Sequence, residues 1–183
     1  MLTVDFSHFP VLRTARLVLR ELLPTDSPAL FRLRSDGRVM EHIGRPRATV
    51  EQDASDLIAR ITTDRHANEG ITWAMTLHDN DMLIGTIGFY RLKLEHHTAE
   101  VGYMMDPDHW GKGLMSEALQ AVVECGFEQF CFHRIEAITD PANAASRALL
   151  LKNGFALEGI QKENFLWNGK FLDSCLFARL QGA

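Results

Sequence analysis

The sequence has 183 residues, 46% of them hydrophobic, which predicts one domain over residues 1–183 with a substantial buried core. Lysine and arginine total 19 against 24 aspartates and glutamates, and the net charge of -5 gives no general electrostatic reason to bind nucleic acid. Three widely spaced cysteines, no long apolar run and no signal-peptide pattern lead us to expect a soluble, cytoplasmic protein with reduced thiols, no metal ion and no membrane contact.

The first third of the chain predicts a strand followed by two helices. Residues 12–22 alternate in hydrophobicity, as a strand with one buried face does. Residues 25–36 and 49–70 place apolar side chains three and four positions apart, which is typical of amphipathic helices. Thr49 and Gln52 have the spacing of a capping box at the start of the second helix.

The middle of the chain changes to a period of two. Residues 71–77, 82–92 and 98–105 are short runs rich in β-branched and aromatic side chains, and they predict three successive antiparallel strands. The third strand is expected to end before Pro107, because proline cannot donate to a strand ladder.

The last third predicts two more helices, a strand and a hairpin. These elements are a helix from about Lys112 to Phe130, a strand at 134–139, a helix at 143–154, and a hairpin over 155–180 that turns at Asn168 and Gly169. The whole order implies an α+β fold with a mixed, mostly antiparallel central sheet and helices on both faces.

Two glycines and a lysine stand where the third strand gives way to a helix, in the segment DPDHWGKGLMSEAL at residues 106–119. A helix begins with N–H groups that have no internal partner and with the positive end of its dipole, so it can bind an anion. Gly111 and Gly113 let a ligand approach the backbone, and Lys112 either adds charge or points into solvent. The nucleotide patterns GxxxxGK[ST] and GxGxxG are absent. From these residues alone, a pyrophosphate-sized ligand and a plain glycine-containing turn are equal alternatives.

Five segments, in order, cover almost the whole chain and resemble one known family. They read TARLVLREL, IGTIGFY, AEVGYMMDPDHWGKGLMSEAL, HRIEAITDPANAASRALLLKNGF and NGKFLDS. The chain resembles the GNAT N-acetyltransferases, and within them the RimJ/RimL-type ribosomal-protein N-terminal acetyltransferases. The resemblance implies a GNAT-like sheet that splays at its central strands, 98–105 and 134–139, and it implies acetyl-CoA as the co-substrate.

The resemblance also implies a set of cofactor contacts. In that family the turn equivalent to residues 110–116 wraps the pyrophosphate with main-chain N–H groups, and the preceding strand end pairs with the pantetheine arm. Met115 stands where the family signature usually has glycine or alanine. Asn143 matches the asparagine that holds the pantetheine, with a helix N-cap as its alternative role. The implied cofactor-binding residues are Met104, Met105, Trp110, Gly111, Lys112, Gly113, Leu114, Met115, Ser116 and Asn143.

Acetyl transfer to an amine requires a neutral nucleophile, a polarised carbonyl and a proton for the departing thiolate. Glu100 is the candidate base because it shares a strand face with Gly102 and Met104; its alternative is an ion-paired strand carboxylate. By resemblance, Ser146 matches the hydroxyl placed near the CoA sulfur; its alternative is a local bond to the backbone.

Aromatic residues are expected to serve mainly in the core. Trp73, Phe89, Tyr90 and Tyr103 alternate along the predicted strands, so only a minority of them should line an acceptor groove. Phe165, Trp167 and Phe171 flank the hairpin turn, where a buried pair is favoured over a ligand site.

The resemblance implies an acetyl-CoA-dependent N-acetyltransferase, and we predict a protein N-terminal α-amine of the ribosomal-protein type as its acceptor. Two alternatives stay open: transfer to a small amine such as a polyamine or an aminoglycoside, and a non-catalytic acyl-CoA-binding sensor. The acidic balance fits either enzyme. An exposed terminal hairpin would also offer a surface for a homodimer.

Overall fold

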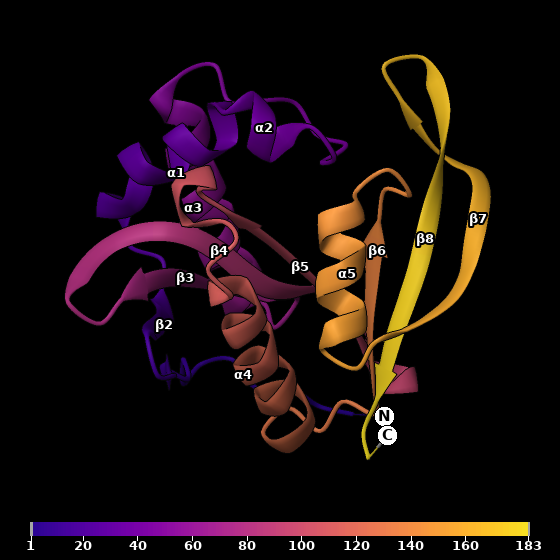
Figure 1. Cartoon of the computed structure of the whole chain (residues 1–183). Coiled ribbons are helices and arrows are strands. Elements are labelled where there is room, and N and C mark those ends of the chain that lie inside the picture. Colours follow the sequence, from indigo (N-terminus) through magenta and orange to yellow (C-terminus); the bar gives the residue numbers. More distant parts are fainter. Residues whose placement is uncertain (1, 183) are drawn as a thin grey trace.

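Eight strands form one open sheet in the order β1-β2-β3-β4-β5-β6-β8-β7 in the computed structural model, which describes residues 2–182 (Figure 1). The strands are β1 (Leu12–Arg13), β2 (Leu17–Glu21), β3 (Ile71–Leu77), β4 (Asn80–Lys93), β5 (Thr98–Met105), β6 (Arg134–Thr139), β7 (Ala156–Trp167) and β8 (Lys170–Leu180). The helices are α1 (Ser27–Ser35), α2 (Gly37–Met40), α3 (Glu51–His66), α4 (Leu114–Glu128) and α5 (Ala144–Lys152). Among the strands of the described residues, only β5 and β6 pair in parallel, which confirms the predicted mixed, mostly antiparallel α+β sheet.

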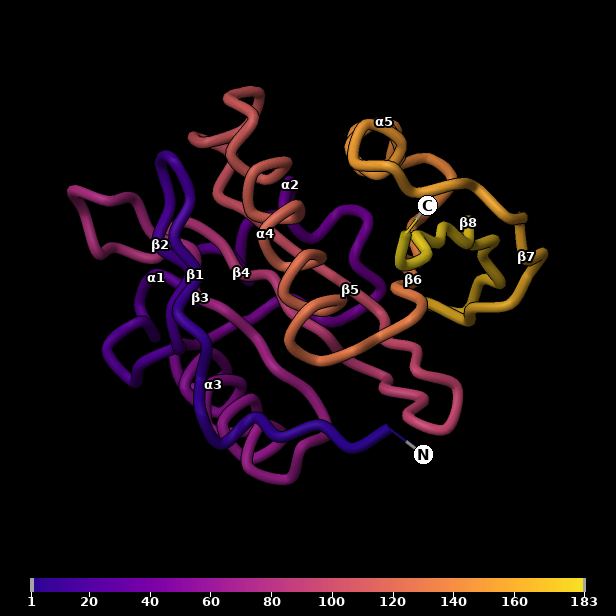
Figure 2. The backbone as a smooth tube through the Cα atoms, turned by 90° about the horizontal axis from the view of Figure 1, so that it is seen from below, coloured from indigo at the N-terminus to yellow at the C-terminus, as the bar shows by residue number. Residues whose placement is uncertain are grey.

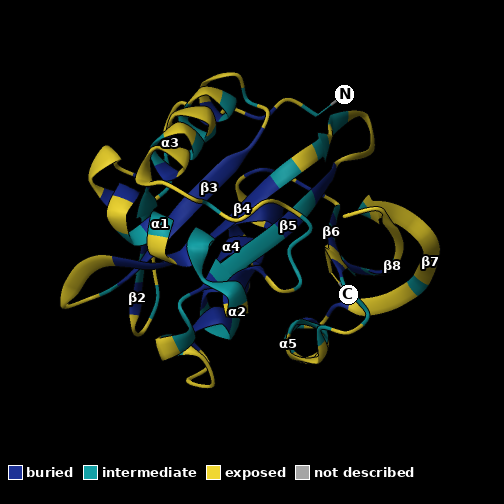
Figure 3. Cartoon of the chain, turned by 90° about the horizontal axis from the view of Figure 1, so that it is seen from above, coloured by how far each residue is buried: buried dark blue, intermediate teal, exposed yellow. Residues whose placement is uncertain are grey.

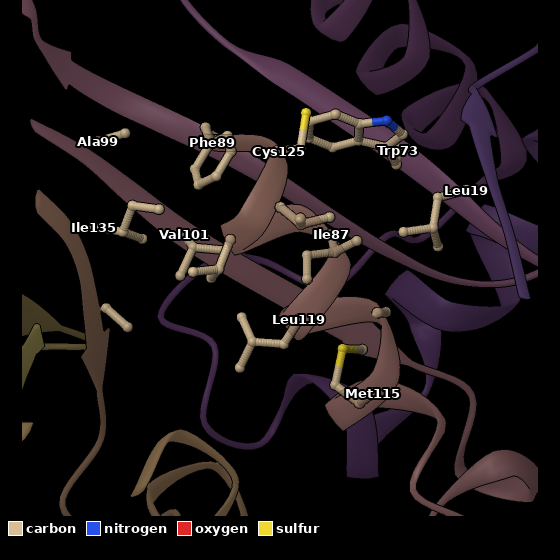
Figure 4. Close-up of a cluster of buried hydrophobic side chains, with 14 of the residues drawn as sticks. Leu19, Trp73, Ile87, Phe89, Ala99, Val101, Met115, Leu119, Cys125 and Ile135 are labelled. Carbon is tan, nitrogen blue, oxygen red and sulfur yellow. The ribbon is translucent and has the colours of Figure 1, made fainter. Parts of the chain in front are cut away.

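Different helices cover the two faces of the sheet. Leu119 of α4 belongs to the same buried cluster as Ile87 and Val101, so α4 lies on one face (Figure 4). On the opposite face, Leu30 of α1 and Ile58 of α3 belong to a second cluster. Figure 3 shows β3 and the middle of β4 buried between these layers, whereas the outer arc of β7 is exposed. The alternating strand residues therefore supply both cores.

The two central strands separate, as the resemblance implied. Strands β5 and β6 are in register only from Thr98 to Glu100, opposite 134–136. Beyond that point β5 stays paired with β4 alone and β6 with β8 alone. Figure 2 shows β6, β8 and β7, with α5 beside them, as a group next to the rest of the sheet. The facing edges of residues 101–105 and 137–139 thus border a gap.

The N-terminal helices differ from the prediction in their ends. The helix expected over 49–70 runs from Glu51 to His66. Asp53, and not Gln52, closes its first turn, because the Asp53 carboxylate accepts the N–H of Thr49 at 2.7 Å. A short additional helix, α2, follows α1. These differences do not alter the predicted arrangement of the sheet.

Within residues 2–182, no helix combines the length and hydrophobicity needed to cross a bilayer. Nor do these residues contain a group of three or more His, Cys, Asp or Glu side chains placed to hold a metal ion.

Candidate active site

The turn between β5 and α4 presents its backbone outward. Gly111 and Gly113 have φ of +72° and +75°, in the left-handed region that favours glycine. A Cβ added at Gly111 would meet nothing within 4 Å, so the turn is open on that side. Across the described chain, no backbone or side-chain acceptor is bonded to the main-chain N–H groups of residues 111–116. These donors, at the positive end of the α4 dipole, suit an anion such as a pyrophosphate.

Neighbouring side chains fix the turn without covering these amides. The indole of Trp110 donates from Nε1 to the Met105 carbonyl at 2.8 Å and ties the turn to the end of β5. The Lys112 ammonium donates to the Asp108 carbonyl at 2.8 Å. Met115 is buried with the core side chains beneath α4, so its bulk points away from the outward backbone (Figure 4). The departure from a small residue at this position is therefore accommodated by the core.

Arg16 lies beside the same turn, a position that no local pattern predicts. The strand expected over 12–22 is two strands, β1 and β2, and Arg16 lies in the turn between them. Its Nη1 donates to the Lys112 carbonyl at 2.8 Å, and its guanidinium is half-exposed. This places a positive charge next to the free amides.

Glu117, in the first turn of α4, holds Arg16 in that position. Its carboxylate accepts from Arg16 Nε at 2.7 Å, from the Arg16 N–H at 2.8 Å and from Thr14 Oγ1 at 2.5 Å. Burial alone would raise the pKa of Glu117, but the hydrogen bonds from Thr14 and Arg16 lower it below the usual value. Glu117 is thus an ionised structural group.

The first turn of α5 brings Ser146 against β5. The Ser146 and Tyr103 hydroxyl oxygens are 2.8 Å apart, which joins the two sides of the gap by a hydrogen bond. Asn143 is the N-cap of α5, and its Oδ1 accepts the N–H of Ser146 at 2.9 Å. Burial raises the pKa of Tyr103 to about 12, so the phenol keeps its proton at neutral pH. The pair can supply one proton to a group in the gap.

The sequence pattern predicts Tyr103 only as one of the aromatic strand residues. Two features identify Tyr103 as a candidate site residue. It lies on the face of β5 that carries Val101 and Met105 toward α4, and it follows Glu100, where the gap between β5 and β6 opens. The hydrogen bond between Tyr103 and Ser146 depends on how α5 packs beside that gap, and no local sequence pattern encodes this packing.

Main-chain donors also face the gap. The Asp106 N–H donates to the Ile84 carbonyl at 2.8 Å, which continues the ladder between β5 and β4. Because antiparallel strands alternate between bonded and non-bonded pairs, the N–H of Met104 points to β4, whereas those of Tyr103 and Met105 point to the gap. Of the two methionines, Met105 therefore offers the donor, and Met104 packs its side chain near α1 and α3.

Glu100 lies on the opposite face of β5 from Tyr103. It is the last residue of β5 that is in register with β6, and it shares its face with Gly102 and Met104. Both carboxylate oxygens accept from Arg91 Nη1 at 2.8 Å, so the resting carboxylate is ion-paired. The structure places Glu100 and Ser146 on two different faces of the sheet at the gap.

A cleft of about 590 Å³ opens between residues 37–47 and the tip of the β7–β8 hairpin. Figure 1 shows the segment after α2 reaching toward that hairpin. His42 Nδ1 lies 2.8 Å from Asp140 Oδ2, which ties this segment to the end of β6. The Tyr90 hydroxyl, on the Glu100 face of β5, donates to the Gly102 carbonyl at 2.9 Å. Burial raises the pKa of Tyr90 to about 12, and the charge of Arg45, a residue of the cleft, acts against that rise. The cleft therefore lies toward the Glu100 face of β5.

A sheet that splays beside an amide-lined turn is the architecture of an acyl-CoA-dependent transferase. The family model described as an acetyltransferase (GNAT) domain matches residues 16–156, and the chain belongs to that family. The uncharacterized N-acetyltransferase YoaA of Bacillus subtilis (strain 168) is 35% identical over 170 residues, which are 93% of this chain and 96% of that protein. The ribosomal-protein-serine acetyltransferase of Escherichia coli (strain K12) is 37% identical over 100 residues, 55% of this chain and 56% of that protein.

A solved structure supports the same fold. RimL, a ribosomal L7/L12 alpha-N-protein acetyltransferase in complex with coenzyme A, has a TM-score of 0.83 and 24% sequence identity, covering 93% of this chain and 96% of that chain. The family match, the similar N-acetyltransferase and this structure together identify the chain as an acetyl-CoA-dependent N-acetyltransferase, with acetyl-CoA as its co-substrate.

Proposed function

We propose that this enzyme acetylates the α-amine at the N terminus of a protein, of the ribosomal-protein type. The observation that carries the proposal is the open cleft between residues 37–47 and the hairpin tip, much of which is lined by exposed side chains such as Glu41 and Arg47. An open cleft admits the end of a longer chain, whereas sites for small molecules enclose most of the ligand surface. The relative named as a ribosomal-protein-serine acetyltransferase adds support.

The cofactor would lie on the α4 and α5 side of the gap. We assign the pyrophosphate to the main-chain N–H groups of residues 111–116, with the Arg16 charge beside them. The pantetheine arm would run along the gap, where the N–H of Met105 and the side-chain amide of Asn143 can donate. The outward glycine turn and the unpaired strand edges leave main-chain donors available to this ligand.

The two proton transfers of the reaction are assigned to residues on the two faces of the sheet at the gap. Bound acetyl-CoA supplies the thioester. On the acceptor face, Glu100 takes the proton released by the amine, through water, as the new C–N bond forms. On the cofactor face, the Ser146 hydroxyl would give its proton to the sulfur as the C–S bond breaks, and Tyr103 would pass its phenol proton to Ser146. The proton that Glu100 releases to water would then restore the phenol. The main-chain N–H of Tyr103 or Met105 stabilises the carbonyl oxygen during transfer.

An α-amine makes modest demands on the base. With a reference pKa of about 7.7 to 8.0, it costs roughly 1 kcal/mol to neutralise at pH 7, whereas a lysine amine near 10.4 costs about 4.6 kcal/mol. Glu100, an ion-paired carboxylate acting through water, therefore has less free energy to supply for an α-amine than for a lysine amine.

The test is release of free CoA thiol from acetyl-CoA with a panel of acceptors, with the product mapped by mass spectrometry. The panel contains peptides with a free α-amine, the same peptides with a blocked N terminus and an internal lysine, a polyamine and an aminoglycoside. We expect turnover with the free α-amine peptides alone. Faster turnover with a small amine would overturn the choice of acceptor, and cofactor binding without release for every amine would indicate a sensor.

A further inference from the structure

Three arginines gather at the acceptor cleft without a carboxylate partner. Arg45 and Arg47 line the cleft and are exposed, and Arg34 donates to the Pro46 carbonyl at 3.2 Å on the same segment. Elsewhere in residues 2–182, six arginines form ion pairs: Arg16, Arg20, Arg38, Arg65, Arg91 and Arg134. No carboxylate of the described residues forms such a pair with the three at the cleft.

The two acids on the same segment, Asp36 and Glu41, form no ion pair with these arginines. Asp36 is already paired with Arg38 at 2.6 Å. Glu41 is the one acid among the described residues that line the cleft, and it is exposed. Burial lowers the pKa of Arg34, and the charges of Arg45 and Arg60 lower it further, as expected for cations that repel one another. The cleft is therefore locally positive in a chain whose net charge is -5.

An aromatic wall stands opposite the arginines. Trp167 lines the cleft and stacks on Phe165, with ring centroids 6.4 Å apart and an interplanar angle of 13°. The prediction of a buried aromatic pair at the hairpin turn is wrong, because Phe165 is 38% exposed and Phe171 is 64% exposed. A Cβ at Gly44 would collide with the Phe165 ring, so this glycine lets the hairpin pack against the arginine segment.

We propose that the cleft selects acceptor N termini that carry aspartate or glutamate within their first residues. Arg45 and Arg47 bind the carboxylates of the acceptor peptide, and Trp167 packs against the peptide on the opposite wall of the cleft. The proposal rests on the proposed function and names its substrate class. The positive charge of the cleft is opposite in sign to the net charge of -5 of the whole chain. Charges act within roughly 8 to 10 Å in physiological salt, so the arginines at the cleft outweigh acids elsewhere on the surface.

The experiment measures kcat/KM for three peptides with the same first residue and with acidic, neutral or basic residues at positions two to five. A phosphate-bearing small amine, phosphoethanolamine, tests whether the arginines serve a small anionic acceptor instead. The enzymes are the wild type, Arg45→Gln, Arg47→Gln and the double variant Arg45→Glu/Arg47→Glu. The matched control is Arg13→Gln, an exposed arginine on β1 that has no ion pair among the described residues.

We expect the wild type to have a kcat/KM about tenfold higher for the acidic peptide than for the neutral one. In each glutamine variant, this ratio should fall by about three- to fivefold. The double variant should prefer the basic peptide. The KM for acetyl-CoA should stay constant in every variant, and Arg13→Gln should behave as the wild type.

Two results would overturn the inference in different ways. Acetylation of all three peptides at equal rates, or equal losses for all three in the arginine variants, would refute the acidic preference and leave the proposed function standing. Turnover of phosphoethanolamine with no turnover of any peptide would refute the proposed function and this inference together.

Discussion

The hydroxyl of Tyr103 lies 2.8 Å from the hydroxyl of Ser146, although the two residues belong to elements on opposite sides of the gap in the sheet. Tyr103 stands on β5 and Ser146 in the first turn of α5. Because β5 and β6 stop pairing after Glu100, this bond forms where a ligand could also reach both residues.

We predict that the pair acts as one proton donor. Ser146→Ala and Tyr103→Phe should each lower kcat by about 100-fold or more while changing the KM for acetyl-CoA little, because general acid catalysis contributes about 100- to 10,000-fold. The double variant should be hardly slower than the worse single variant. Steady-state kinetics measure this, and multiplicative losses would show that the two hydroxyls act independently.

The pKa of Tyr103 gives a pH prediction for the same pair. Burial raises this pKa to about 12, so the phenol stays protonated and the donor stays competent throughout the neutral and mildly alkaline range. The kcat profile of the wild type should show no alkaline decline below about pH 10, near the reference pKa of tyrosine. A decline that disappears in Tyr103→Phe would contradict the assignment of a raised pKa.

Gly113→Asp should weaken CoA binding strongly while leaving the protein folded. The new carboxylate would repel the pyrophosphate, and the left-handed φ of +75° adds strain of about 1 to 2 kcal/mol. A Cβ at this position would lie 3.6 Å from Arg16 Nη2, so the aspartate also draws the guanidinium away from a ligand. We expect a loss of affinity of about 100-fold by calorimetry.

The control for this variant is Gly182→Asp. Gly182 also has a left-handed φ, +81°, and a Cβ there would meet nothing within 4 Å, so the backbone strain is matched away from the turn. Unchanged affinity in Gly113→Asp would remove the pyrophosphate from this turn.

Glu117→Gln should destabilise the protein at neutral pH and not in acid. Hydrogen bonds from Thr14 and Arg16 outweigh burial and lower the folded-state pKa of Glu117 below 4.5. A depressed pKa contributes stability that is present above the unfolded pKa and is lost as the pH falls through the folded one. Urea unfolding should show a cost of about 1 to 3 kcal/mol at pH 7 that shrinks below about pH 4.5. A cost independent of pH would mean that the charge of Glu117 is irrelevant.

His42→Ala should affect the acceptor and not the cofactor. His42 ties the cleft segment to Asp140 at 2.8 Å, so its loss frees one wall of the cleft. We expect the acceptor KM to rise about three- to tenfold with the KM for acetyl-CoA unchanged. The control is His96→Ala, since the His96 side chain is 70% exposed on the loop after β4. An equal rise in both KM values would contradict the division of the site between the two faces.

Periodicity and turn chemistry predicted much of the fold. The strands at 71–77 and 98–105, the helix of α4 and the hairpin turn at Asn168 and Gly169 all depend on local patterns, which is why the sequence revealed them. The split of residues 12–22 into β1 and β2 was missed, because the Arg16 turn between them is stabilised by Glu117, about a hundred positions away.

The candidate site was predictable where it depends on the backbone. The glycines of the turn and the N-cap at Asn143 follow from local rules, and the structure shows both conformations. The Tyr103–Ser146 bond and the arginine-lined cleft were not predictable, because each joins segments brought together by the divergence of β5 and β6 and by the packing of Gly44 under Phe165.

The central claim is that the free amides of residues 111–116 hold the pyrophosphate of acetyl-CoA. A crystal structure of the protein with CoA bound tests it most directly. The account predicts pyrophosphate oxygens within hydrogen-bonding distance of several of these N–H groups, with the pantetheine arm between β5 and β6. Cofactor bound elsewhere, or these amides paired with protein groups in the complex, would contradict it.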